Sequence, residues 1–168
     1  MRAVSTFIAG LSLVCRIALG SVFAILIVTV AIQVFTRTFS ASSPIWTEEL
    51  SRFALLYLAA FGVGLSYRSG DLVNVDILQE AVSERKAWWM RFVSAIATAG
   101  LALLMIAPAW RFTTIGAMQT SPSLRWSMDL VHASVLVLAV TLFVFALLRV
   151  IGMLVGVDDG RTQFAEEE

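Results

Sequence analysis

Four long stretches without a charged residue dominate this chain and limit what it can fold into. Residues 17–36, 53–67, 92–110 and 130–148 contain 20, 15, 19 and 19 residues with no Asp, Glu, Lys or Arg. The hydrocarbon core of a bilayer is about 30 Å thick, and roughly 20 helical residues cross it. Three of the stretches therefore have the length of a membrane-spanning helix, and the second is shorter.

The composition agrees with a membrane protein. Of the 168 residues, 59% are hydrophobic and 14% are charged, and the mean hydropathy is +0.87, whereas soluble domains contain about 25% charged residues. Cys15 and His132 are the only cysteine and the only histidine, which excludes an internal disulfide and a bis-histidine haem. The formal net charge is zero, so nothing indicates a nucleic-acid partner. We expect no cofactor and no metal.

The second stretch becomes long enough to span a membrane if its helix begins before the charged residues that precede it. Ser43 is suited to the N-cap and Pro44 to the first helical position. Glu48 and Glu49 then fall in the early turns, where carboxylates favour the positive end of the helix dipole. Arg52 follows at the spacing that allows an ion pair with either glutamate.

Tryptophan positions support four spans. All five lie at or just beyond the ends of the uncharged stretches, as in an aromatic belt at the membrane interface: Trp46, Trp88, Trp89, Trp110 and Trp126. We therefore predict an all-α integral membrane protein with spans at about 17–36, 44–67, 89–110 and 130–155. These spans form a membrane domain of residues 1–156, followed by an acidic cytoplasmic tail, residues 157–168.

The distribution of Lys and Arg predicts the orientation. Eight lie at the N-terminus, in the second loop or at the C-terminus: Arg2, Arg16, Arg68, Arg85, Lys86, Arg91, Arg149 and Arg161. Four lie in the first and third loops: Arg37, Arg52, Arg111 and Arg125. By the positive-inside rule, both termini and the second loop are cytoplasmic.

The second loop also has a helical pattern. Val75, Leu78 and Val82 recur on one side, opposite Asp76 and Glu80. This pattern predicts a short helix at the cytoplasmic interface that leads into Trp88 and Trp89. A solvated loop with chance periodicity is the alternative.

Small residues four positions apart indicate close helix contacts. In the second span these are Ala60 with Gly64 and Gly62 with Ser66, and Ala95 with Ala99 repeats the spacing in the third. They pack either the spans of this chain on each other or an outside partner. No acidic or basic residue lies deep inside any of the four stretches, so the chain lacks the groups that an autonomous ion-coupled carrier uses inside a bilayer. We also expect no enzyme activity.

Several short segments together resemble a known family. They are Gln33-Val34-Phe35-Thr36-Arg37, Trp46-Thr47-Glu48-Glu49-Leu50-Ser51-Arg52, Phe61-Gly62-Val63-Gly64, Arg68-Ser69-Gly70, Val75-Asp76-Ile77-Leu78 and Ser121-Pro122-Ser123-Leu124. In order and spacing they are similar to the small membrane subunit of tripartite ATP-independent periplasmic (TRAP) transporters. The segment from Trp46 to Arg52 is the most specific, and the likeness extends over essentially the whole chain.

The resemblance implies a function and partners. It implies a non-catalytic scaffold in the bacterial inner membrane, surrounded by lipids and bound to a large multi-span permease. A sodium gradient would drive uptake of small organic anions delivered by a periplasmic solute-binding protein. Nine residues become candidates for structural or subunit-interface roles: Arg37, Trp46, Glu48, Glu49, Arg52, Gly62, Gly64, Arg68 and Asp76. Those from Trp46 to Arg52 would lock the periplasmic end of the second span, internally or against the large subunit.

Two other functions remain open at the level of sequence. One is a haem-free membrane anchor of a redox complex, which the single histidine permits. The other is a small channel formed by homo-oligomers, which the lack of polar stripes along the spans disfavours.

Overall fold

The computed structural model describes residues 2–40, 44–69 and 83–156. These residues form four α-helices: α1 (Arg2–Ser40), α2 (Ile45–Ser69), α4 (Glu84–Gly116) and α5 (Asp129–Val155). Each helix is long and apolar enough to cross a membrane. The predicted all-α fold with four spans is thereby confirmed.

The helices extend beyond several of the predicted spans. α1 begins at Arg2 rather than near residue 17, so Arg16 lies inside a continuous helix and does not precede it. α2 begins at Ile45, directly after Pro44, and Ser43 lies outside the described residues. The predicted interfacial helix falls mostly within residues 70–82, and the acidic tail is residues 157–168. Both also lie outside the described part of the chain.

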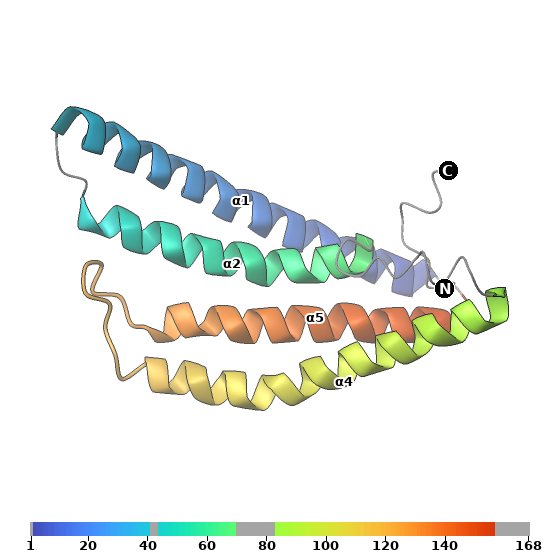
Figure 1. Ribbon diagram of the computed structural model, residues 1–168. Helices are drawn as coiled ribbons and strands as arrows, with labels where there is room; N and C mark the ends of the chain where they lie inside the picture. The colour runs from blue at the N-terminus through green and yellow to red at the C-terminus, as the bar shows by residue number, and fades with distance from the viewer. Residues whose placement is uncertain (1, 41–43, 70–82, 157–168) are drawn as a thin grey trace.

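The helices lie side by side in the order α1, α2, α5, α4, as Figure 1 shows, because the main contacts join α1 to α2, α2 to α5, and α5 to α4. Chain order and spatial order differ, since α5 inserts between α2 and α4. One end of this layer contains the connection of residues 117–128 between α4 and α5, together with the start of α2 (Figure 1). We call it the loop end and the other the opposite end.

Small residues bring α2 and α5 together. Ala60 is fully buried and its carbonyl accepts a hydrogen bond from the Thr141 hydroxyl at 3.0 Å. One turn later, a Cβ added to Gly64 would lie 2.6 Å from Cδ2 of Phe145. The Ala60 and Gly64 pair therefore packs against another helix of the same chain, as in other membrane helix pairs with small residues four apart.

The contact of α4 with α5 uses alanines spaced by two helical turns. Ala95, Ala102 and Ala109 are buried at 1%, 0% and 4% exposure. A seven-residue repeat of buried positions keeps one helix face against its neighbour. Pro108 lies inside α4, where proline removes a backbone hydrogen bond and favours bending, and α4 is curved in Figure 1.

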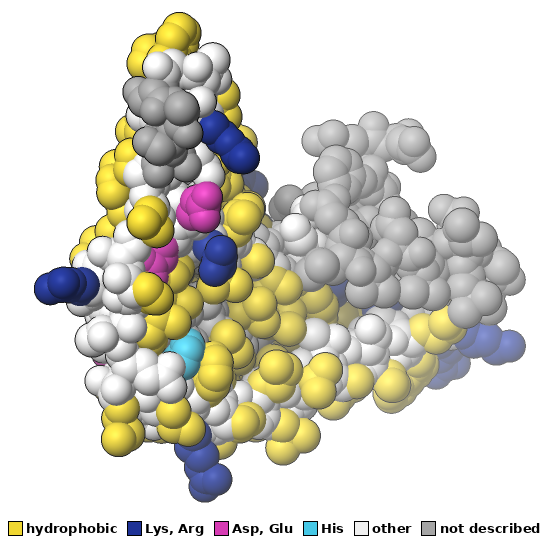
Figure 2. Space-filling model, turned by 60° about the vertical axis from the view of Figure 1, so that its left-hand side comes forward, with side chains coloured by type: hydrophobic (Ala, Val, Ile, Leu, Met, Phe, Trp, Pro, Cys, Tyr) yellow, Lys and Arg dark blue, Asp and Glu magenta, His cyan; other side chains and the backbone are white. Residues whose placement is uncertain are grey.

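Much of the apolar surface has no partner within the described residues. In the most apolar 18-residue segment of each helix, 6% of α1 is buried inside the protein, compared with 28% of α2 and 22% each of α4 and α5. Figure 2, with the loop end turned forward, shows charged side chains gathered at that end and hydrophobic ones along the helix flanks. Exposed apolar flanks between polar ends are what a lipid-surrounded protein requires.

Candidate interaction site

The loop end is organised around the carboxylate of Glu49. Its Oε2 accepts hydrogen bonds from the backbone N–H groups of Ser123 and Leu124, at 3.0 and 2.9 Å. Hydrogen bonds to an ionised acceptor are roughly twice as strong as neutral ones. Glu49 is in the first turns of α2, so one side chain ties the start of α2 to the connection between α4 and α5.

The connection of residues 117–128 is folded so that these two amides face the Glu49 carboxylate. Thr120 and Ser127 form an isolated antiparallel bridge, and Ser121 N–H donates to the Trp126 carbonyl at 2.8 Å. The Ser121 side chain is 2% exposed and accepts a hydrogen bond from Trp126 N–H at 3.2 Å. Arg125 adopts the left-handed backbone conformation, with φ of 54°, which reverses the chain at the tip.

The start of α2 is fixed by its own side chains. The Thr47 side chain is completely buried, and its hydroxyl donates to the Pro44 carbonyl at 2.7 Å. The Thr47 backbone N–H donates to the same carbonyl at 3.1 Å. These two contacts hold the first turn in place, which sets the position of the Glu49 carboxylate two residues later.

Three other side chains of this segment are open to the surroundings of the protein. Glu48, Arg52 and Trp46 are exposed. Within the described residues, no ion pair joins Arg52 to Glu48 or Glu49. The pairing expected from their spacing is therefore wrong, because Glu49 turns toward the backbone amides and leaves Arg52 on the outside.

Comparison with known protein families identifies the family of this chain. Residues 26–156 match the family described as "Tripartite ATP-independent periplasmic transporters, DctQ component". The chain belongs to this family. The resemblance to the small membrane subunit of TRAP transporters is thereby confirmed, and the DctQ family favours a transporter component over the redox-anchor and channel hypotheses. A search among curated proteins finds no match.

Two segments that carry the resemblance meet in space in this DctQ-family chain. Glu49 belongs to the first, and Ser123 and Leu124 belong to the second, more than 70 positions later. The sequence predicts a structural role for Glu49 but does not predict the two amides. Their segment was part of the resemblance, although a backbone donor leaves no trace in residue type.

The remaining candidate residues are distributed over the layer. Gly64 is at the α2–α5 contact, and Gly62 faces α1, with Leu19 3.7 Å from where its Cβ would be. Arg68, near the end of α2, donates a hydrogen bond to the Ser12 hydroxyl of α1. Arg37 is exposed in the last turn of α1. Asp76 lies outside the described residues.

His132 joins the end of α4 to the start of α5. Its Nδ1 lies 2.9 Å from the Phe112 carbonyl oxygen, and since a carbonyl only accepts, the imidazole donates. The two rings stack with centroids 3.9 Å apart. These contacts hold the end of α4 against the start of α5. In the described part of the chain, no three His, Cys, Asp or Glu side chains are grouped as metal ligands would be.

Gly116 permits this close approach, which gives a first prediction. A Cβ at Gly116 would lie 2.5 Å from His132 Nδ1 and 2.8 Å from the Asp129 backbone nitrogen. Because a backbone atom cannot rotate away, we expect Gly116→Ala to lower the free energy of unfolding by about 2 kcal/mol, as overpacking does. Thermal unfolding in detergent, followed by tryptophan fluorescence, would measure the change.

Gly100→Ala is the control for Gly116→Ala, since no atom lies within 4 Å of a Cβ at Gly100. Alanine is the better helix former there, so the midpoint of unfolding should stay the same or rise. Equal midpoints for the two variants would contradict the tight contact at Gly116.

Proposed function

We propose that this DctQ-family chain is a non-catalytic scaffold subunit of a TRAP transporter that takes up small organic anions with a sodium gradient. Its partners are a large permease subunit and a periplasmic solute-binding protein. It lies in the bacterial inner membrane with both termini in the cytoplasm, which makes the loop end periplasmic. Family membership and the excess of Lys and Arg at the opposite end support this proposal.

The observation that carries the scaffold role is that the side chains at the start of α2 have two different environments. Glu49 is used internally, on the amides of Ser123 and Leu124, whereas Trp46 and Arg52 are exposed beside it. Tryptophan and arginine are the side chains most enriched among residues that dominate binding energies at protein interfaces. A braced helix end with these two side chains outward suits attachment to a fixed partner.

A scaffold role also fits the unused apolar surface. A transport domain that moves through a membrane must move against a part that stays still. The layer is held internally by small-residue contacts between α2 and α5 and by the Glu49 contact, and its flanks are free to extend such a static part. Removing the chain would then impair transport without changing solute recognition.

We expect Arg52→Ala to weaken attachment to the large permease. Loss of an arginine that dominates the binding energy of an interface costs about 2 kcal/mol or more, which corresponds to an affinity loss of about thirtyfold. The measurement is recovery of the large subunit when this chain is purified by an affinity tag, together with solute uptake by reconstituted vesicles. The affinity of the separate binding protein for its solute should not change.

Arg111→Ala is the matched control for Arg52→Ala, because Arg111 is also exposed and lies near the loop end, in the last turns of α4. It removes the same charge and should retain recovery within about twofold. If Arg52→Ala also left recovery and uptake unchanged, Arg52 would have no part in the assembly.

A further inference from the structure

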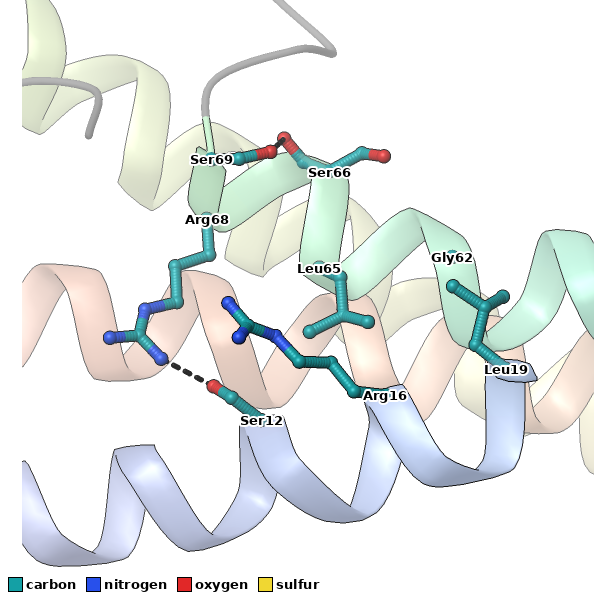
Figure 3. Close-up of a pocket in the computed structure, with 8 residues that line it drawn as sticks. All are labelled: Ser12, Arg16, Leu19, Gly62, Leu65, Ser66, Arg68 and Ser69. Atoms are coloured by element: carbon teal, nitrogen blue, oxygen red, sulfur yellow. Dashed lines mark hydrogen bonds between the residues drawn. The ribbon is translucent and has the colours of Figure 1, made fainter. Parts of the chain in front are cut away.

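A pocket of about 200 Å³ lies between α1 and α2 near the opposite end of the layer. Figure 3 shows Arg16 reaching in from α1 and Arg68 from α2, so that both guanidinium groups face the same space. Ser12 lines the polar end and is hydrogen-bonded to Arg68. Leu19, Leu65 and Gly62 line the part that runs along the helices toward the middle of the layer.

The electrostatics of this pocket call for an anion. Within the described residues, no carboxylate forms an ion pair with Arg16 or Arg68. Two guanidinium groups in one pocket repel each other, and at the edge of a bilayer water screens that repulsion less than in bulk solution. Arginine binds phosphate through two parallel N–H donors, and two arginines converging from different helices present a favourable receptor for such a group.

The size and position of the pocket favour a lipid, rather than a soluble molecule, as the source of the phosphate. Its volume suits a phosphate group and is below the roughly 300–1,000 Å³ of pockets for drug-sized molecules. The polar end lies at the end of α2, one residue before the helix stops at Ser69, at a depth where headgroups lie. The apolar end continues onto α1, whose span is almost entirely unburied, so that acyl chains could extend along it in the hydrocarbon.

We propose that Arg16, Arg68 and Ser12 form a binding site for the headgroup phosphate of an anionic phospholipid, whose acyl chains follow the groove between α1 and α2. The lipid neutralises the two arginines and ties α1, which contacts mainly α2, to the rest of the layer. Ser12 and Arg16 precede the residues that match the DctQ family. The site is independent of the proposed attachment through Arg52.

The test uses the full chain purified in detergent, with phosphatidylglycerol titrated in and bound lipid counted by native mass spectrometry. We expect Arg16→Ala combined with Arg68→Ala to weaken binding about tenfold or more. The control combines Arg85→Ala with Lys86→Ala, two exposed residues at the start of α4, at the same end of the layer. It removes the same charge outside the pocket and should weaken binding less than about twofold.

A second variant tests the site without removing either arginine. Ser12→Asp places a carboxylate beside Arg68, where it would pair with the guanidinium and repel a phosphate. It should lower phosphatidylglycerol binding about tenfold while the thermal midpoint stays the same or rises. Unchanged lipid binding in this variant would overturn the proposal, even if the double alanine variant failed to fold.

Three other outcomes would also overturn the lipid site. Equal losses in the pocket and control variants would show diffuse charge attraction rather than a built site. Inorganic phosphate that displaces phosphatidylglycerol at equal concentration would show a site for the free anion. The third outcome is a double alanine variant that binds as much lipid as before but no longer co-purifies with the large permease. It would show that the two arginines bind an acidic side chain of that partner.

Discussion

Replacing Gly64 by alanine should lower the free energy of unfolding of this protein by about 2 kcal/mol and reduce its recovery with the proposed partner, the large permease. The added Cβ would lie 2.6 and 2.9 Å from two ring carbons of Phe145 and 3.3 Å from Cβ of Thr141. Carbon atoms that do not share a bond prefer about 3.5–4.0 Å. The methyl group therefore requires either the phenylalanine ring or the whole of α5 to move.

The ring of Phe145 has little room to move. It is 4% exposed and belongs to the main buried cluster, with Cys15, Tyr67 and Ala146. The cluster includes side chains from α1, α2 and α5, so a displaced ring would disturb the contacts of three helices. Separation of α2 from α5 would also lengthen the hydrogen bond from Thr141 to the Ala60 carbonyl, which is now 3.0 Å.

The matched control for Gly64→Ala is Gly62→Ala on the same helix. A Cβ at Gly62 has only Leu19 within 4 Å, at an ordinary van der Waals distance of 3.7 Å, so this variant should be neutral or slightly stabilising. Both are measured by thermal unfolding in detergent and by co-purification. If Gly64→Ala matched Gly62→Ala in both assays, the close α2–α5 contact would not exist in the protein.

The sequence predicts the number and type of elements well because the membrane imposes a simple rule. A span must satisfy its own backbone hydrogen bonds and present apolar side chains. The four uncharged stretches meet the second requirement, and it can be recognised from residue types alone. The small residues Ala60 and Gly64 also indicated a close contact correctly. The helix that contains the first predicted span begins earlier, at Arg2, because an arginine that reaches a membrane surface, such as Arg16, is tolerated inside a continuous helix.

Partners within the layer could not be predicted in the same way. Nothing in the sequence indicates that α5 lies between α2 and α4, because each of the spans has apolar side chains on more than one side. The spacing of Glu49 and Arg52 suggested an ion pair, but Glu49 instead accepts from the amides of Ser123 and Leu124. A backbone donor more than 70 residues away carries no sequence pattern, so this contact requires the fold.

The contact made by Glu49 predicts a large effect for a single residue at the loop end. Glu49→Ala removes two hydrogen bonds to an ionised acceptor, which together contribute about 3 kcal/mol even though the site is half-buried. The tip formed by Ser123 and Leu124 then loses its attachment to α2. We expect the thermal midpoint to fall and hydrogen exchange to become faster at these two amides, with little change in the middle of α5.

The neighbouring carboxylate supplies the control for this prediction. Glu48 is exposed and forms no ion pair with a described residue, so Glu48→Ala should change the free energy of unfolding by at most about 0.5 kcal/mol. Glu49→Gln should fall between the two, because the amide oxygen can still accept while the charge is lost. Removing one negative charge is common to all three variants. The variants differ in whether an acceptor remains at position 49. Equal hydrogen-exchange rates at Ser123 and Leu124 in Glu48→Ala and Glu49→Ala would therefore show that charge alone, rather than this contact, sets the structure of the loop end.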